Sequence, residues 1–96
     1  MARYRQGPYI VEEGYAMIDQ DGQIAHRDTF AETPAEANQR LLEALGIDRY
    51  QDEIETWQPG VAVQVTDTNI DYRTRSRRRI VMPWSVWDQY RDPYVY

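Results

Sequence analysis

The sequence contains no cysteine and no lysine, and it has no long hydrophobic run. The absence of cysteine excludes disulfides and thiolate zinc sites. No apolar stretch is long enough to cross a bilayer, and no apolar core follows the charged N-terminus as it would in a signal peptide, so we expect a cytoplasmic protein without a membrane association. All 11 basic residues are arginine, whose planar guanidinium group suits carboxylates, phosphates and aromatic rings.

Residues that commonly carry chemistry are scarce. The five glycines are scattered and form no phosphate loop, and neither Ser76 nor Ser85 lies in a nucleophile-elbow sequence. The single histidine, His26, would share a strand face with Asp28, where a surface hydrogen bond is a far more frequent outcome than a catalytic pair. DQDG (19–22) looks like the start of a calcium loop, but Asp28 stands where that loop needs glutamate. We therefore expect no enzyme, no cofactor and no metal site.

The local patterns predict an α+β fold in one domain spanning residues 1–96. We expect an antiparallel sheet of about four strands in β-β-α-(α)-β-β order, with helices on one face and an aromatic C-terminal tail. The expected strands cover residues 9–18, 23–30, 61–65 and 70 onward, with turns at 19–22 and 66–69. The expected helices cover residues 33–46, 48–57 and a short segment after Pro83.

The first of these helices has the strongest local signals. Thr33 suits the N-cap, Pro34 the first helical position, and Glu36 completes a capping box. Gly46 is placed to end the helix. The apolar stripe of this helix is expected to consist of Ala37, Leu41, Ala44 and Leu45.

The stretch RTRSRRR (73–79) holds five arginines in a chain with a net charge of −5. Outside it, 6 arginines face 16 acidic residues, a net charge of −10. On one strand face, alternate arginines would repeat about every 7 Å, which suits a row of phosphates, with Tyr72 and Trp84 stacking on bases. Other interpretations are a docking patch for an acidic partner, a basic hairpin tip at 75–78, and neutralisation by acids on neighbouring strands. The acids considered for that neutralisation are Glu12, Glu13, Asp19 and Asp28.

Two further surfaces suit a protein partner. The second helix presents an acidic face, and the tail is rich in tyrosine and tryptophan, which dominate interface hot spots together with arginine. We expect Trp84 and Trp87 to cover the sheet. The predicted partner-binding residues are Asp48, Asp52, Glu53, Glu55, Arg73, Arg75, Arg77, Arg78, Arg79, Tyr90, Tyr94 and Tyr96.

Two family resemblances bear on function. The segment TPAEANQRLLEALG resembles the helix that follows the β-hairpin in HicB-like antitoxins: Thr33, Glu36 and Ala37 match, whereas Asn38 is out of position and the family's Pro-Asp-Leu-Pro-Gly stretch is absent. In overall profile the chain resembles small phage-encoded inhibitors of bacterial defence such as anti-CRISPR proteins, which are often acidic, cysteine-free α+β domains without catalytic motifs.

These observations lead to one functional hypothesis and one alternative. The hypothesis is a non-enzymatic module that binds a protein partner stoichiometrically, in its most specific form a phage-type inhibitor of a bacterial nucleic-acid-handling complex. The alternative is an RNA- or DNA-binding regulator or antitoxin that uses the basic stretch 73–79.

Overall fold

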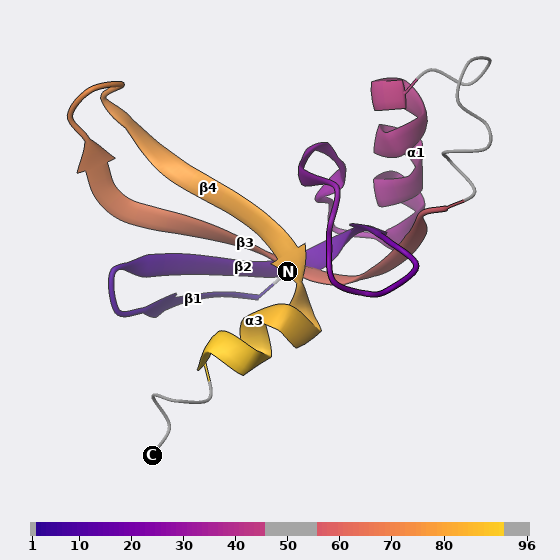
Figure 1. Ribbon diagram of the computed structural model, residues 1–96, viewed down its shortest axis with the longest axis horizontal. Helices are drawn as coiled ribbons and strands as arrows, with labels where there is room; N and C mark the ends of the chain where they lie inside the picture. Colours follow the sequence, from indigo (N-terminus) through magenta and orange to yellow (C-terminus); the bar gives the residue numbers. More distant parts are fainter. Residues whose placement is uncertain (1, 46–55, 92–96) are drawn as a thin grey trace.

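Four antiparallel strands form one sheet in the order β1-β2-β3-β4 (Figure 1). The computed structural model describes residues 2–45 and 56–91. The strands are β1 (Arg3–Gln6), β2 (Tyr9–Ile18), β3 (Gln58–Asp71) and β4 (Ser76–Pro83). A short 3₁₀ helix, η1 (Arg27–Thr29), and the helices α1 (Pro34–Leu45) and α3 (Trp84–Arg91) complete the described part of the chain. The α+β class and the strand order of the sequence-based prediction are confirmed, and no helix in these ranges is long and apolar enough to span a membrane.

The first hairpin lies nearer the N-terminus than the sequence pattern indicated. β1 pairs with β2 from Arg3↔Glu12 to Gln6↔Tyr9, and Gly7 adopts the positive φ of 58° that this turn requires. Residues 19–22 do form a turn, but 23–30 do not return as a strand. That segment meets β2 through the isolated bridge Ile18↔Ala25 and through hydrogen bonds to Met17, whose carbonyl oxygen accepts from the backbone N–H of His26 and whose N–H donates to the Thr29 hydroxyl. The 3₁₀ turn of η1 interrupts any longer strand pairing. The predicted strand at 23–30 is therefore wrong.

The helix predicted after Thr33 is confirmed. The Thr33 hydroxyl accepts a hydrogen bond from the backbone N–H of Glu36 at 3.1 Å, which is the bond expected of an N-cap residue. Ala37 and Leu41 are fully buried and Leu45 is half-buried, whereas Ala44 is exposed and does not belong to the apolar stripe. The predicted terminator Gly46 and most of the second predicted helix lie outside the described residues. Trp57, at the end of that segment, packs against the cluster under α1.

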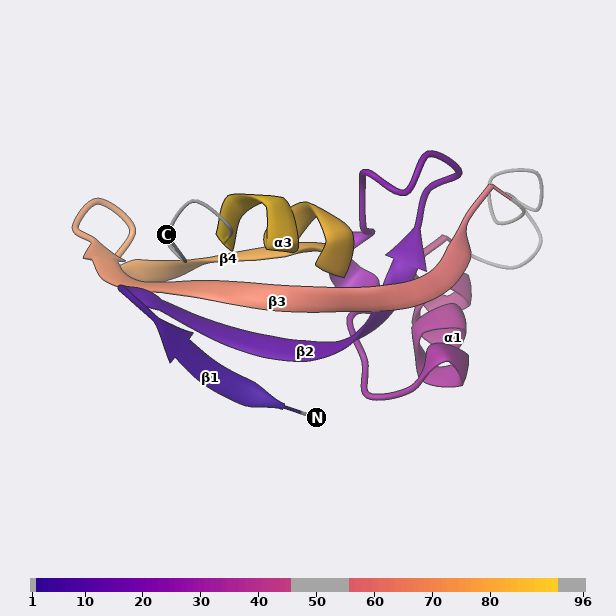
Figure 2. The same ribbon diagram turned by 90° about the horizontal axis from the view of Figure 1, so that it is seen from below.

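The described core has three clusters: one beneath each helix, and a smaller one of Ala16, Ala25 and Ala62 on the other face of β2. Beneath α3, Trp87 packs against Val11, Val63 and Val65. Beneath α1, Leu41 packs with Met17 and two alanines. Because side chains alternate along a strand, the odd-numbered residues of β2 share one face, so both helices pack on that face, as predicted. The sheet twists along its length, and the two helices consequently do not lie in one layer (Figure 2).

Candidate binding surface

The arginine-rich stretch forms the tip and outer strand of the β3/β4 hairpin. The turn covers residues 72–75, so Arg73 and Arg75 lie in it, whereas Arg77, Arg78 and Arg79 lie on β4. Figure 1 shows this hairpin projecting from the sheet at the end opposite α1. The prediction of one continuous strand face for these arginines is wrong, since the chain reverses within the stretch. The alternative of a basic tip is closer, although the turn comes three residues before the predicted 75–78.

Asp71 organises the turn. Its side-chain Oδ1 accepts from the backbone N–H of Arg73 at 2.9 Å, and its carbonyl oxygen accepts from the backbone N–H of Arg75 at 2.6 Å. Arg75 has a φ of 53°, the left-handed conformation that favours glycine. The hydroxyls of Thr74 and Ser76 lie 2.6 Å apart and form a hydrogen bond across the turn. This local network orders a loop that consists almost entirely of polar residues.

A bulge fixes the base of the hairpin to the rest of the sheet. The β3–β4 register shifts between Thr66 and Ile70, so the segment predicted as a turn, 66–69, instead continues β3 with a bulge. Thr68 donates twice to the carbonyl oxygen of Pro8, from its backbone N–H at 2.9 Å and from its hydroxyl at 2.8 Å. The projecting tip is thereby attached to the turn between β1 and β2.

The arginines of the hairpin are not neutralised by the described acids. Among residues 2–45 and 56–91, none of Arg73, Arg75, Arg77, Arg78 and Arg79 forms an ion pair, and all five are exposed. Among the acids considered as their partners, Glu12 on β2 is paired across the sheet with Arg3 on β1 and Gln64 on β3. Asp28 instead lies near Arg27, with 3.9 Å between its Oδ1 and Nε of the arginine. The interpretation in which Glu12, Glu13, Asp19 or Asp28 neutralises the stretch finds no ion pair among these residues, and the guanidinium groups face solvent.

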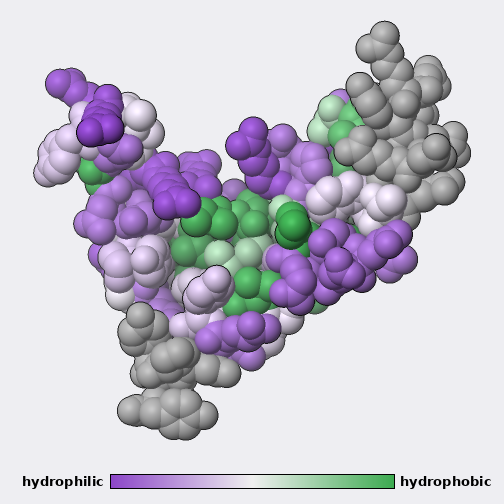
Figure 3. Space-filling model, viewed as in Figure 1, coloured by the Kyte–Doolittle hydropathy of each residue, from purple (hydrophilic) through white to green (hydrophobic). Residues whose placement is uncertain are grey.

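Aliphatic side chains continue β4 directly after the arginines. Ile80 is 39% exposed, and Val81 and Met82 are half-buried. Figure 3 shows an apolar area in the middle of this face of the molecule, beside the strongly polar hairpin. Only β3 pairs with β4, which is therefore an edge strand of the described sheet. Sequence reasoning on the arginines missed this aliphatic run, although the letters IVM after RRR were its signal.

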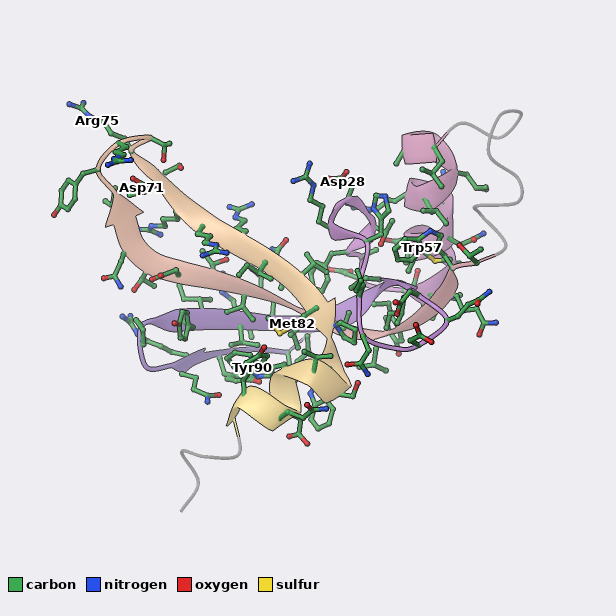
Figure 4. The ribbon with its side chains drawn as sticks, in the orientation of Figure 1. Asp28, Trp57, Asp71, Arg75, Met82 and Tyr90 are labelled. Carbon is green, nitrogen blue, oxygen red and sulfur yellow. The ribbon has the colours of Figure 1, made fainter. Side chains whose placement is uncertain are left out.

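The other predicted partner-binding residues do not join the hairpin. Tyr90 lies on α3 and is 65% exposed, and Figure 4 shows it well away from Arg75 at the tip. The aromatic neighbours that were expected to cover the sheet do so: Trp84 is half-buried and Trp87 is 6% exposed. The remaining predicted residues, Asp48, Asp52, Glu53, Glu55, Tyr94 and Tyr96, lie outside the described part of the chain.

His26 makes a structural contact with the backbone of Asp28, and the two side chains do not form the acid–histidine pair that a shared strand face would allow. Its Nδ1 accepts from the backbone N–H of Asp28 at 3.3 Å and so caps η1. Its ring meets Trp57 edge-on with the centroids 5.4 Å apart. The carboxylate of Asp28 faces Arg27 and not the imidazole. His26 thus helps to hold η1 against the segment that precedes β3.

The 19–22 segment is held as a turn by its own first residue. Oδ1 of Asp19 accepts from the backbone N–H groups of Gln23 and Ile24, at 2.8 and 3.1 Å. Gly22 supplies a positive φ of 71°. Within residues 2–45 and 56–91, no group of three His, Asp or Glu side chains is placed to hold a metal ion. A surface hollow lies between η1 and α1 and is open to solvent. Its lining includes Asp28, Glu36 and Arg40.

Comparison of the chain with protein-family models, with curated proteins and with solved structures finds no match to any of them.

Proposed function

We propose that this protein is a non-enzymatic binding module that recognises a protein partner stoichiometrically, with the β3/β4 hairpin as its main docking element. The observation that carries the proposal is the group of five unpaired arginines on an ordered, projecting hairpin. Unpaired guanidinium groups are available to bind carboxylates in two-pronged geometry. Arginine is also among the residues that contribute most to protein–protein affinity.

The distribution of charge supports a directional mode of docking. Residues 66–83 contain five arginines and two acids, whereas 27–45 contain two arginines and four acids. These segments lie at opposite ends of the molecule (Figure 1). A partner with an acidic surface would be attracted to the hairpin end and repelled from the α1 end, so that the charge pattern would orient the complex during encounter.

The most specific form of the proposal is a phage-type inhibitor of a bacterial nucleic-acid-handling complex. Its support is the acidic composition and the acidic run Asp48, Asp52, Glu53 and Glu55, which could occupy a surface that otherwise binds nucleic acid. That run lies outside the described residues. The hairpin therefore supports the general form of the proposal, and the composition supports the specific form.

Affinity capture from a bacterial lysate, followed by light scattering on the purified complex, tests the general form. We expect one dominant protein partner at a fixed stoichiometry. Replacing Arg75, Arg77 and Arg78 with serine should abolish capture, whereas replacing Arg27 and Arg40 at the opposite end should not. Charge reversal at Asp52, Glu53 and Glu55 tests the specific form separately. Capture of no partner, or equal capture by both arginine variants, would refute the general proposal.

Direct binding of RNA or DNA is a second candidate, which one observation favours. Tyr72 lies in the turn beside Arg73 and is 93% exposed, so its ring is available to stack on an unpaired base. Fluorescence anisotropy with labelled single-stranded oligonucleotides at several salt concentrations tests it. Phosphate binding predicts that affinity falls steeply as the salt concentration rises. The slope of log affinity against log salt concentration should become shallower by about one for each contacting arginine that is replaced. Absence of binding at low salt would eliminate this candidate.

A further inference from the structure

We propose that the outer edge of β4 (Ser76–Pro83) binds an extended acidic and aliphatic segment of the protein partner as a fifth strand. This inference rests on the proposed function, since it requires that the partner be a protein. It adds the mode of recognition and the chemistry of the segment recognised.

The first support is the open edge itself. β4 has eight residues, and β3 pairs with one side of it from Ala62↔Pro83 to Asp71↔Ser76. Alternate residues of an edge strand direct their N–H and C=O groups away from the sheet, where an incoming strand can bond them. No other strand of the described chain occupies that side. The opposite edge, β1, has only four residues and offers a shorter template.

The second support is the division of β4 into a basic half and an aliphatic half on both faces. The register with β3 places Arg79 and Val81 on one face and Ile80 and Met82 on the other. By the same alternation, Arg77 lies on the face of Arg79 and Val81. Arg78 lies on the face of Ile80 and Met82. An added strand would therefore meet arginine and then aliphatic side chains on either face. Its complement is a segment with acidic residues opposite 77–79 and aliphatic residues opposite 80–82.

Charge and hydrophobicity favour this occupant over the two others that could approach the edge. Pairing of β4 with β4 of a second copy would bring six arginines into one short ladder, and charged edge strands commonly prevent such self-pairing. A nucleic acid would satisfy the arginines but would leave Ile80 exposed and would add no apolar contact to Val81 and Met82, which are half-buried against the core. A strand that carries both acidic and aliphatic residues satisfies both halves.

A synthetic peptide tests the inference without the natural partner. The probe is the acetylated and amidated peptide Val-Ile-Val-Glu-Glu-Glu, which is antiparallel and complementary to 77–82, with a fluorescent label. Two further versions are N-methylated on alternate amides, so that in one the methyl groups face β4 and in the other they face solvent. We expect the unmodified and solvent-methylated peptides to bind and the β4-methylated peptide not to bind. Chemical-shift changes in labelled protein should concentrate on Ser76–Pro83.

Matched variants then assign the binding to this edge. Arg78→Ala on β4 should weaken the peptide about tenfold, as expected for loss of a charge-assisted contact, whereas Arg3→Ala on β1 should leave the Kd unchanged. Equal binding of both methylated peptides, equal effects of the two variants, or shift changes elsewhere would overturn the inference. So would self-association through β4, or an oligonucleotide that binds there while the peptide does not. If the lysate partner still binds while the peptide fails, the edge-strand mode is wrong and the proposed function stands.

Discussion

The indole Nε1 of Trp87 donates a hydrogen bond to the hydroxyl of Tyr4 at 3.1 Å, across 83 positions of sequence. This contact joins α3, the last described helix, to β1, the first strand. The same indole ring meets Tyr9 edge-on, with the ring centroids 6.4 Å apart. Trp87 thus connects the edge strand β1, its neighbour β2 and the helix that follows β4, and it closes one end of the core.

Truncation of Trp87 should therefore be severe. Trp87→Ala removes a nearly fully buried side chain and should lower the free energy of unfolding by about 3–5 kcal/mol. Tyr4→Phe removes only the hydroxyl and should lower it by about 1 kcal/mol. Tyr90→Ala, at an exposed position of the same helix, should change it by less than about 0.5 kcal/mol. Urea denaturation followed by circular dichroism measures all three, and similar costs for Trp87→Ala and Tyr90→Ala would contradict the assignment.

Thr29 supports the segment between β2 and α1 through its buried hydroxyl. Its Oγ1 accepts from the backbone N–H of Met17 at 2.8 Å and donates to the carbonyl oxygen of His26 at 2.7 Å. Thr29→Val leaves the buried Met17 N–H without this partner, whereas the His26 carbonyl keeps the backbone N–H of Thr29 at 3.1 Å, and the change should cost about 1–3 kcal/mol of unfolding free energy. Thr29→Ser retains the hydroxyl and should cost less than the valine variant. A larger loss for serine than for valine would show that the methyl group matters more than the hydrogen bonds.

Two glycines of the sheet should differ in their tolerance of alanine. A Cβ on Gly14 would lie 2.6 Å from the carbonyl oxygen of Ala31, which is backbone and cannot easily move. A Cβ on Gly60 would lie 2.6 Å from Cδ1 of Ile18, the flexible end of a side chain. We expect Gly14→Ala to cost roughly 1–3 kcal/mol, in the range of overpacking, and Gly60→Ala to cost clearly less. Thermal unfolding of the two variants compares them, and the opposite order would count against this explanation.

Arg75 should be the one arginine of the turn whose removal stabilises the fold. Its φ of 53° is disfavoured for a residue with a Cβ, so Arg75→Gly should raise the free energy of unfolding by about 1 kcal/mol. Arg73 is not at a positive φ, and Arg73→Gly should give no such gain. Guanidinium chloride denaturation distinguishes them. If both variants lose stability equally, the left-handed conformation of Arg75 carries no cost.

The elements with local signals were predictable from the sequence. The Thr33 cap and the spacing of Ala37 and Leu41 indicate α1 without tertiary information, and the alternation in 9–18 and 61–65 indicates the two central strands. The short helix after Pro83 and the burial of Trp87 followed from the spacing of the tryptophans.

The errors arose where pairing partners decide the structure. Residues 23–30 alternate like a strand, but η1 interrupts them, and the Thr29 side chain accepts the Met17 N–H that the carbonyl of a paired strand would accept. The Gly7–Pro8 turn that forms β1 is a weak signal. The polar run at 66–69 is typical of a turn, yet Thr68 bonds to Pro8, 60 residues away in the chain, and β3 continues. The arginine alternation could not reveal where the chain reverses, because that depends on the hydrogen bonds of Asp71.

The two hydrogen bonds from Thr68 to the Pro8 carbonyl oxygen also have a kinetic consequence. Because these bonds fix the base of the β3/β4 hairpin, the hairpin has its binding orientation before a partner arrives. Little conformational entropy is therefore lost when it binds. Association would then need no slow rearrangement of the hairpin, and its rate would be governed by electrostatic attraction between the arginines and an acidic target.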